Sequence, residues 1–189
     1  MAGFRLGEGG WVCVGTMLAG PVEGVTRRSE GLALRPPRLE DGGTLWALAR
    51  AAGGLDVNSP YAYLVLCRSF ARTCVLAEAD DQPVGFLSAF RPPSDPAAVF
   101  IWQLGVLPAY RRRGVAGALV RGLLARPACA GVRFVEATTT PGNAAVRALF
   151  RRLAAAAGTR YQEGSGFDRT LFPDGAHASE QLLRVGPLC

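Results

Sequence analysis

The sequence of 189 residues contains no lysine, so all 21 of its basic side chains are arginines. The formal net charge of +6 at pH 7 therefore depends on arginine alone. Such exclusive use of arginine is more typical of a genome-wide codon bias than of selection for a basic surface. A positive charge of this size permits binding to nucleic acid or to a polyanionic cofactor, and it does not distinguish between them.

Histidine is almost as scarce, and the cysteines lack a metal-binding pattern. The sequence has one histidine, His177, and no C-x-x-C pair, so we expect no metal site. Five cysteines are present: Cys13, Cys67, Cys74, Cys129 and Cys189. Because their number is odd and no pairing pattern is visible, we expect reduced, mostly buried thiols in a cytoplasmic protein.

Long apolar runs are also absent, since none approaches the ~20 residues that a membrane-spanning helix needs. We therefore expect no membrane partner. Residues 1–30 contain many glycines and show no hydrophobic period, which predicts a disordered leader. The remaining residues, 31–189, are predicted to form one domain, because a chain of this length fits a single compact core.

Hydrophobic periodicity in residues 31–189 predicts a mixed α/β domain with the element order β-α-α-β-β-β-α-β-α-β-β. Helices are predicted where apolar residues repeat every three or four positions between proline and glycine signals. The predicted helices are 39–54, 59–71, 112–127 and 141–158. The predicted strands are 31–37, 73–79, 84–90, 97–107 and 131–140, followed by a loop-rich hairpin in 159–189.

The segment VLPAYRRRGVAGALV, residues 106–120, leads from a buried strand into a helix that begins near Gly114. Small residues at its start let a ligand approach the backbone, and free N–H groups with the helix dipole attract anions. Three arginines precede it: Arg111, Arg112 and Arg113. We interpret the segment as a diphosphate cradle. The alternatives are a solvated helix start and a nucleic-acid patch, although the other arginines show no grouping with aromatic residues.

Two short motifs lie near the starts of two predicted helices. The first, V-x-P-x-x-R-x-x-G-x-A, is met by Val106, Pro108, Arg111, Gly114 and Ala116. The second, N-x-x-V-x-x-L-F, is met by Asn143, Val146, Leu149 and Phe150. In this order and spacing they resemble the cofactor motifs of the GNAT superfamily of N-acetyltransferases. The resemblance implies the GNAT fold, a mostly antiparallel sheet with a splayed parallel strand pair, flanked by helices.

The resemblance also implies acetyl-CoA as co-substrate, with backbone groups of residues 104–106 binding its pantetheine arm and polarising the thioester carbonyl. The residues implied in cofactor binding are Leu104, Gly105, Val106, Arg111, Arg112, Arg113, Gly114, Val115, Ala116, Gly117, Asn143 and Phe150. Many relatives have tyrosine at the position of Phe150, where it protonates the departing thiolate. Phenylalanine cannot donate a proton, so no general acid is assigned.

One carboxylate is predicted to lie inside the sheet. Glu136 is in the middle of a strand that we expect to be covered on both faces. A buried carboxylate is costly unless a cation or good donors meet it, so Glu136 must have a partner. That partner is either an amine substrate or, in a structural ion pair, an arginine such as Arg133 or Arg147.

Other polar and aromatic residues are candidates for the acceptor site, each with an ordinary structural alternative. Asp56 either binds the substrate or belongs to a turn. Trp102 either lines the ligand site or belongs to the hydrophobic core. Gln103 either binds substrate or satisfies buried backbone. His177 lies in a polar loop, where histidines are usually idle. The further candidates are Asn58, Ser59, Thr138 and Tyr61, of which Tyr61 has edge-of-core packing as its simplest role.

Within the superfamily, residues 55–67 and 102–106 resemble enzymes that acetylate a small diamino acid. The resemblance implies a homodimer and direct transfer in a ternary complex. Glu136, through water, or Asp56 would be the catalytic base, and Thr138, Ser59 or His177 would hold the substrate carboxylate. The alternatives are acetylation of another amine, such as a polyamine, an antibiotic or a protein N-terminus, and a non-catalytic acyl-CoA-binding module.

Overall fold

The computed structural model describes residues 31–173 and 177–188, so the predicted leader 1–30 lies outside the described residues. The strands are β1 (Leu32–Arg35), β2 (Val75–Ala79), β3 (Gln82–Phe90), β4 (Ala98–Val106), β5 (Phe134–Thr139), β6 (Arg160–Ser165) and β7 (Gln181–Gly186). The main helices are α2 (Gly42–Ala52), α3 (Pro60–Ser69), α4 (Val115–Leu124) and α5 (Ala144–Ala156). This order of elements confirms the predicted mixed α/β fold.

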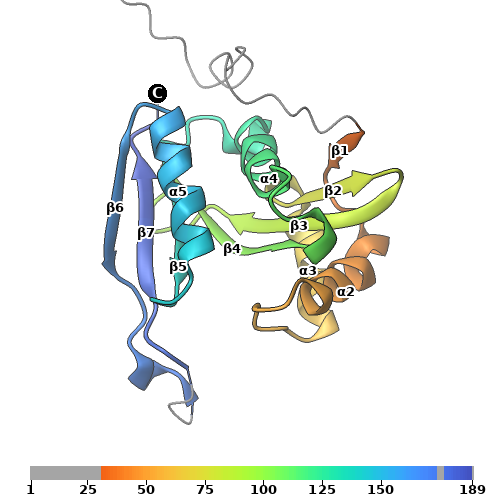
Figure 1. The fold of residues 1–189 in the computed structure, drawn as a ribbon, viewed down its shortest axis with the longest axis horizontal. Coiled ribbons are helices and arrows are strands. Elements are labelled where there is room, and N and C mark those ends of the chain that lie inside the picture. Colours follow the sequence, from red (N-terminus) through yellow and green to blue (C-terminus); the bar gives the residue numbers. More distant parts are fainter. Residues whose placement is uncertain (1–30, 174–176, 189) are drawn as a thin grey trace, which may run out of the picture.

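The strands form one seven-stranded sheet in the order β1-β2-β3-β4-β5-β7-β6 (Figure 1). Within the described part of the chain, β4 and β5 are the one parallel pair, and every other neighbouring pair is antiparallel. The connection between β6 and β7 projects away from the sheet (Figure 1). The parallel pair therefore lies near the middle of the sheet, between two antiparallel halves.

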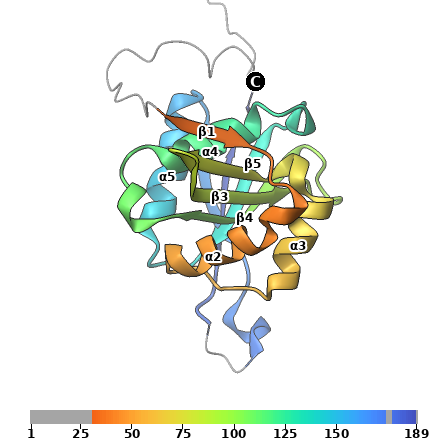
Figure 2. The same cartoon turned by 90° about the vertical axis from the view of Figure 1, so that its right-hand side faces the viewer.

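Helices cover the two faces of the sheet unequally. α4 and α5 pack on one face, where Leu119, Leu123 and Phe150 join the large core of the sheet. α2 and α3 pack on the other face, over β2 and β3, through residues such as Leu45 and Tyr63 (Figure 2). This unequal cover leaves Trp102 of β4 43% exposed.

Helix ends follow the proline and glycine signals, with two corrections. α3 begins at Pro60 after Ser59, as predicted, although the Ser59 side chain makes no cap hydrogen bond. The predicted helix starts at residues 112 and 141 were each three residues too early. Arg112 and Gly114 have φ values of 61° and 84°, which a right-handed helix does not allow, so α4 starts at Val115.

A bulge in β4 places its side chains for the site. The register between β3 and β4 shifts so that Ser88 faces Gln103 and Ala89 faces Ile101, which leaves Trp102 as the extra residue. A bulge reverses the alternation of side chains beyond it. Gln103 therefore points toward α3, where it contacts Tyr63.

Candidate active site

β4 and β5 separate after a short parallel contact. Three residue pairs join them, and the last is Phe100 with Glu136, whereas β4 continues to Val106. Among residues 31–173 and 177–188, this edge of β4 therefore has no strand partner beyond Phe100. Gly105 lies on the free edge, and a Cβ there would come within 2.7 Å of the Phe86 ring. The free backbone edge can pair with an extended ligand, because sheet edges present unsatisfied N–H and C=O groups.

The N-terminus of α4 follows the free edge of β4 and suits an anionic group. α4 has ten residues, and the N–H groups of its first turn have no acceptor within the helix. The Val115 side chain is buried, which anchors this turn to the core. A Cβ added at Gly114 would meet nothing within 4 Å, so the backbone there is open to a ligand. These features fit the pyrophosphate of a coenzyme.

The three arginines before α4 have different surroundings. Arg111 donates from Nε to the Val106 carbonyl at 3.2 Å and from its terminal nitrogen to the Ala52 carbonyl. Its guanidinium therefore joins the end of α2 to the end of β4. Arg112 is exposed, and the Arg113 guanidinium lies 5.3 Å from the centre of the Tyr110 ring. Arg112 and Arg113 remain beside the helix terminus as charges for a phosphate.

The second motif contributes capping and packing. The Asn143 side-chain oxygen accepts a hydrogen bond from the Val146 N–H at 3.3 Å and so caps α5. Phe150 is 2% exposed and packs in the core beneath α5. The Phe150 position thus holds apolar packing, and no proton donor is available there.

Gln103 holds the loop between α2 and α3 against β4. Its Nε2 donates to the Asp56 carbonyl at 2.7 Å, and its Oε1 accepts from the Tyr63 hydroxyl at 3.1 Å. Gln103 and Tyr63 are both buried, so this chain of hydrogen bonds is protected from water. Gln103 therefore has the structural role that the sequence offered as its alternative, because its side chain provides a hydrogen bond to a backbone carbonyl.

The structure brings His177 and Asp56 together although 121 positions separate them. His177 Nε2 lies 3.2 Å from Asp56 Oδ2 and 3.9 Å from Glu180 Oε1. The His177 ring also stacks on Phe172, with 4.1 Å between ring centroids. Sequence reasoning missed Glu180, whose spacing of three residues from His177 was the available signal. The β6–β7 connection and the α2–α3 loop thereby form one acidic corner with an imidazole.

The imidazole of His177 has a raised pKa. The first cause is the hydrogen bond between its Nδ1 and the Ala178 carbonyl at 2.6 Å, and the second is the Asp56 carboxylate. Both partners stabilise the protonated ring. The stabilisation that the charged pair gives is therefore complete below the ordinary histidine pKa of 6.5, and it is lost as the pH rises through the raised value.

Glu136 is buried as predicted, and its cation partner is a residue that the sequence did not indicate. Its carboxylate forms an ion pair with Arg184, which faces it on the neighbouring strand β7. Arg184 also contacts Asp95 at 3.1 Å, and its guanidinium lies 3.8 Å from the centre of the Phe134 ring. The structure favours the ion-pair alternative, with Arg184 in place of Arg133 or Arg147. The Glu136 carboxylate is therefore paired with a cation that belongs to the chain itself.

The other candidates for substrate contact differ in exposure. Tyr61 is 73% exposed, so its predicted packing at the edge of the core was wrong. Trp102 is exposed, which excludes the core alternative for it. Asn58 is half-buried and donates to the Asp56 carbonyl at 3.4 Å. Two polar side chains complete the set, namely exposed Ser59 and half-buried Thr138.

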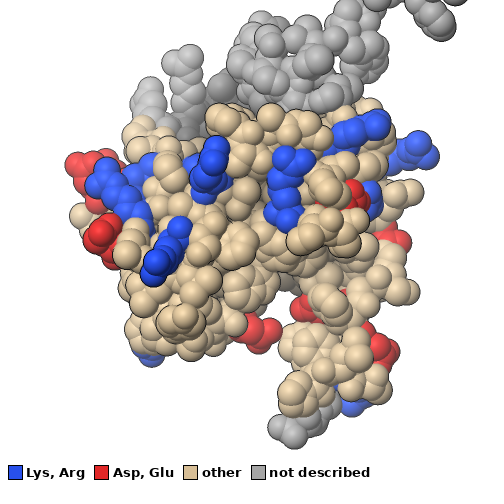
Figure 3. Space-filling view, turned by 180° about the vertical axis from the view of Figure 1, so that it is seen from behind, with Lys and Arg blue, Asp and Glu red and all other residues tan. Residues whose placement is uncertain are grey.

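Negative charge gathers near the β6–β7 connection. A hollow of about 450 Å³ lies at its base, and Glu163, Asp168 and Glu180 contribute to its lining. On the face shown in Figure 3, acidic side chains lie around this projecting part, with basic atoms also visible on it, whereas most of the visible arginine surface lies on the body of the molecule. A small cationic ligand approaching the acidic corner therefore meets a favourable potential.

The cysteines of the described residues are poor nucleophiles. Burial raises the pKa of Cys67 and of Cys74 to about 11, and it also raises the pKa of Cys129. Little thiolate is present at neutral pH.

Residues 31–173 and 177–188 contain no group of three His, Cys, Asp or Glu side chains that could hold a metal ion. In the same residues, no helix combines the length and the apolar character that crossing a membrane requires.

A nuclear magnetic resonance titration tests the environment of His177 directly, because the chain has one histidine. In protein without a histidine tag, we expect the imidazole pKa to lie above 6.5. Asp56→Asn removes one of the causes, leaves the Ala178 carbonyl and Glu180, and so lowers the pKa part of the way. Glu40→Gln is the matched control, since Glu40 makes no contact with His177. A wild-type pKa at or below 6.5 would contradict the contact.

Comparisons with known proteins identify the family. Residues 45–155 match the acetyltransferase (GNAT) family. An L-2,4-diaminobutyric acid acetyltransferase of Shouchella clausii is 43% identical over 166 residues, which cover 88% of this chain and 93% of that protein. A protein of the same name from Streptomyces coelicolor is 40% identical over 166 residues, covering 87% and 98%.

A solved structure gives the same grouping. Diaminobutyrate acetyltransferase EctA from Paenibacillus lautus, in complex with L-2,4-diaminobutyric acid and coenzyme A, superposes with a TM-score of 0.80 at 42% identity. The match covers 82% of this chain and 95% of that chain. The chain therefore belongs to the acetyltransferase (GNAT) family, and within it groups with the L-2,4-diaminobutyric acid acetyltransferases.

Proposed function

We propose that the protein transfers the acetyl group of acetyl-CoA to the γ-amino group of L-2,4-diaminobutyrate. The observation that carries this proposal is the hydrogen bond of 2.7 Å from Gln103 to the Asp56 carbonyl. It places the acidic acceptor loop directly beside the free edge of β4. An amine bound by the loop and a thioester bound along the edge are thus neighbours, and proximity supplies much of the rate.

The free edge of β4 and the N-terminus of α4 bind acetyl-CoA in this proposal. Acetyl-CoA supplies an acetyl group activated as a thioester. Backbone groups of Leu104, Gly105 and Val106 pair with the pantetheine arm, and the first turn of α4 binds the pyrophosphate with Arg112 and Arg113. A backbone N–H near Val106 stabilises negative charge that develops on the thioester oxygen.

The acidic corner binds the diamino acid. Diaminobutyrate carries two ammonium groups and one carboxylate, so it needs more negative than positive protein groups. Asp56 and Glu180 supply the negative charge, and the imidazole between them is placed to contact the substrate carboxylate when it is protonated. Ser59, Asn58 and Trp102 line the approach from α3 and β4.

Proton removal is assigned to Asp56, because the imidazole of His177 is assigned to the substrate carboxylate. An ammonium group with a free pKa near ~10 must lose a proton before its nitrogen attacks the thioester carbon. Asp56 is exposed and close to the free edge, whereas the Glu136 carboxylate is paired with Arg184. The new amide bond forms as the carbon–sulfur bond breaks, and the leaving thiolate takes a proton from water because Phe150 has none to give.

The product, Nγ-acetyl-diaminobutyrate, is then the substrate for a cyclising step in ectoine biosynthesis, which gives the protein a role in osmoprotection. We propose that this takes place in the cytoplasm. The support is chemical, because the acceptor is a small amino acid and the buried cysteines of the described residues are unpaired thiols.

The protein is a homodimer in this proposal, supported by large apolar side chains that are exposed: Trp102, Phe167 and Leu171.

The proposal is tested by turnover of acetyl-CoA with L-2,4-diaminobutyrate, ornithine, lysine, spermidine and a peptide N-terminus. We expect kcat/KM for diaminobutyrate to exceed that for ornithine by about tenfold or more, because one extra methylene group in a fitted pocket is discriminated at that level. Product analysis by nuclear magnetic resonance identifies the acetylated nitrogen. Preference for another amine would keep the coenzyme site and replace the substrate, and coenzyme binding without any turnover would indicate a non-catalytic module.

Two carboxamide variants in the same assay distinguish the roles of the Asp56 and Glu136 carboxylates. Asp56→Asn is expected to lower kcat/KM by about 100-fold, the usual loss when a general base is removed. Glu136→Gln is expected to retain activity within about tenfold and to lower the unfolding temperature more, since it breaks a buried ion pair. If Glu136→Gln lost as much activity as Asp56→Asn at unchanged stability, the base would be Glu136.

The oligomeric state is measured by light scattering during gel filtration. A homodimer has twice the chain mass of 19.9 kDa. Trp102→Glu places a charge on an exposed apolar position and is expected to shift the wild-type dimer toward the monomer, whereas Arg68→Glu, on the exposed surface of α3, leaves it unchanged. A monomer mass for the wild type across micromolar concentrations would exclude the dimer.

A further inference from the structure

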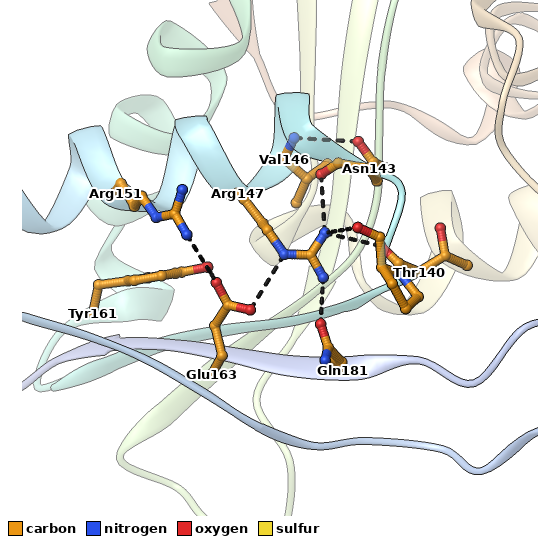
Figure 4. Close-up of polar contacts among 9 residues, drawn as sticks. Thr140, Asn143, Val146, Arg147, Arg151, Tyr161, Glu163 and Gln181 are labelled. Carbon is orange, nitrogen blue, oxygen red and sulfur yellow. Dashed lines mark hydrogen bonds and ion pairs between the residues drawn. The ribbon is translucent and has the colours of Figure 1, made fainter.

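Arg147 is an almost buried arginine on α5 that the proposed reaction does not use. It is 9% exposed, and its guanidinium points from α5 toward the start of that helix and toward β6 and β7 (Figure 4). A buried guanidinium needs hydrogen-bond acceptors for most of its five donors. The acceptors around Arg147 come from two different parts of the molecule.

The first acceptors are backbone carbonyls of the loop that joins β5 to α5. Arg147 Nη1 donates to the Thr140 carbonyl at 3.0 Å and to the Pro141 carbonyl at 2.7 Å (Figure 4). The Asn143 carbonyl lies at 3.5 Å from the same nitrogen. The Nη1 nitrogen alone thus contacts three backbone carbonyls of the turn before α5.

The second acceptors belong to the hairpin of β6 and β7. Arg147 Nε donates to Glu163 Oε2 at 3.2 Å, and Arg147 Nη2 donates to the side-chain oxygen of Gln181. Gln181 is the first residue of β7 and follows Glu180, which faces His177. Arg147 therefore joins the turn before α5 to the strands that lead to the acidic corner.

The turn that Arg147 holds is one side of the opening between β4 and β5. β5 ends at Thr139, three positions beyond its last contact with β4, and residues 140–143 continue from there to the cap of α5. Movement of this turn changes the width of the opening at its outer end. The carbonyls of Thr140 and Pro141 restrain that movement through Arg147.

We propose that Arg147 is a positioning residue that sets the width of the coenzyme cleft by tying residues 140–143 to β6 and β7. The inference rests on the proposed function for the location of coenzyme in the cleft. Lysine cannot replace arginine in this role, because a single ammonium group lacks the planar fork that reaches both sets of acceptors. A positive charge at position 147 is therefore not enough to hold residues 140–143 against β6 and β7.

Arg147→Lys tests this role, with Arg151→Lys as the matched control. Arg151 is one helical turn away and contacts the same Glu163 carboxylate at 3.2 Å, but its side chain is 61% exposed and makes no contact with residues 140–143. We expect the dissociation constant of coenzyme A, measured by calorimetry, to rise about tenfold in Arg147→Lys, the scale of one lost charge-assisted hydrogen bond. The control is expected to stay within about twofold of the wild type.

Kinetics separates positioning from general loss of structure. In Arg147→Lys the KM for acetyl-CoA is expected to rise about tenfold, while the KM for the amine stays within about twofold. An unchanged dissociation constant for coenzyme A would overturn the proposal, and so would an equal rise in both KM values. Because coenzyme A binding is measured without amine, an incorrect substrate assignment leaves this test intact.

A second variant applies if Arg147→Lys fails to fold. Gln181→Ala removes one acceptor on β7 and leaves Arg147 and the turn unchanged. It is expected to weaken coenzyme A binding in the same direction by about threefold, a fraction of one hydrogen bond. If Gln181→Ala folded and bound coenzyme A with wild-type affinity, the tie between the turn and β7 would have no role in the cleft.

Discussion

The separation of β4 from β5 after Phe100 and Glu136 is the constraint on which the site depends. Backbone N–H and C=O groups inside a protein need partners, and an interrupted parallel pair leaves a row of them on β4 without a strand. The start of α4 lies beside this row because only the short connection of residues 107–114 separates it from the end of β4. An edge for an extended chain and a helix terminus for an anion thus lie side by side.

Buried polar side chains then fix the loops around that edge. Gln103 and Tyr63 hold the α2–α3 loop, Arg184 joins β5 to the β3–β4 connection, and Arg147 holds the turn before α5. Gln103, Arg184 and Arg147 each bond groups from at least two elements. Asp56 and Glu180, which both lie beside His177, are the charges that the proposal assigns to a ligand.

The order of elements could be predicted because it depends on local periodicity and on proline and glycine signals. The helix near Gly114 was predicted from the same local signals, whereas the role of the backbone at residues 104–106 was implied by the resemblance to the GNAT superfamily. Contacts between distant segments could not be predicted. Arg184 as the partner of Glu136 follows from the pairing of β5 with β7, and the approach of His177 to Asp56 follows from the path of the β6–β7 connection. Neither contact produces a local pattern in the sequence.

Hydrogen–deuterium exchange of backbone amides with and without coenzyme A tests the central claim most directly. The account predicts that amides of residues 104–106 and 114–117 become protected when coenzyme A binds, because these segments include the N–H groups without partners on the free edge of β4 and in the first turn of α4. Protection should be absent from β1 and β2, on the far side of the sheet. Protection limited to the β6–β7 hairpin, with residues 104–106 unchanged, would contradict the account.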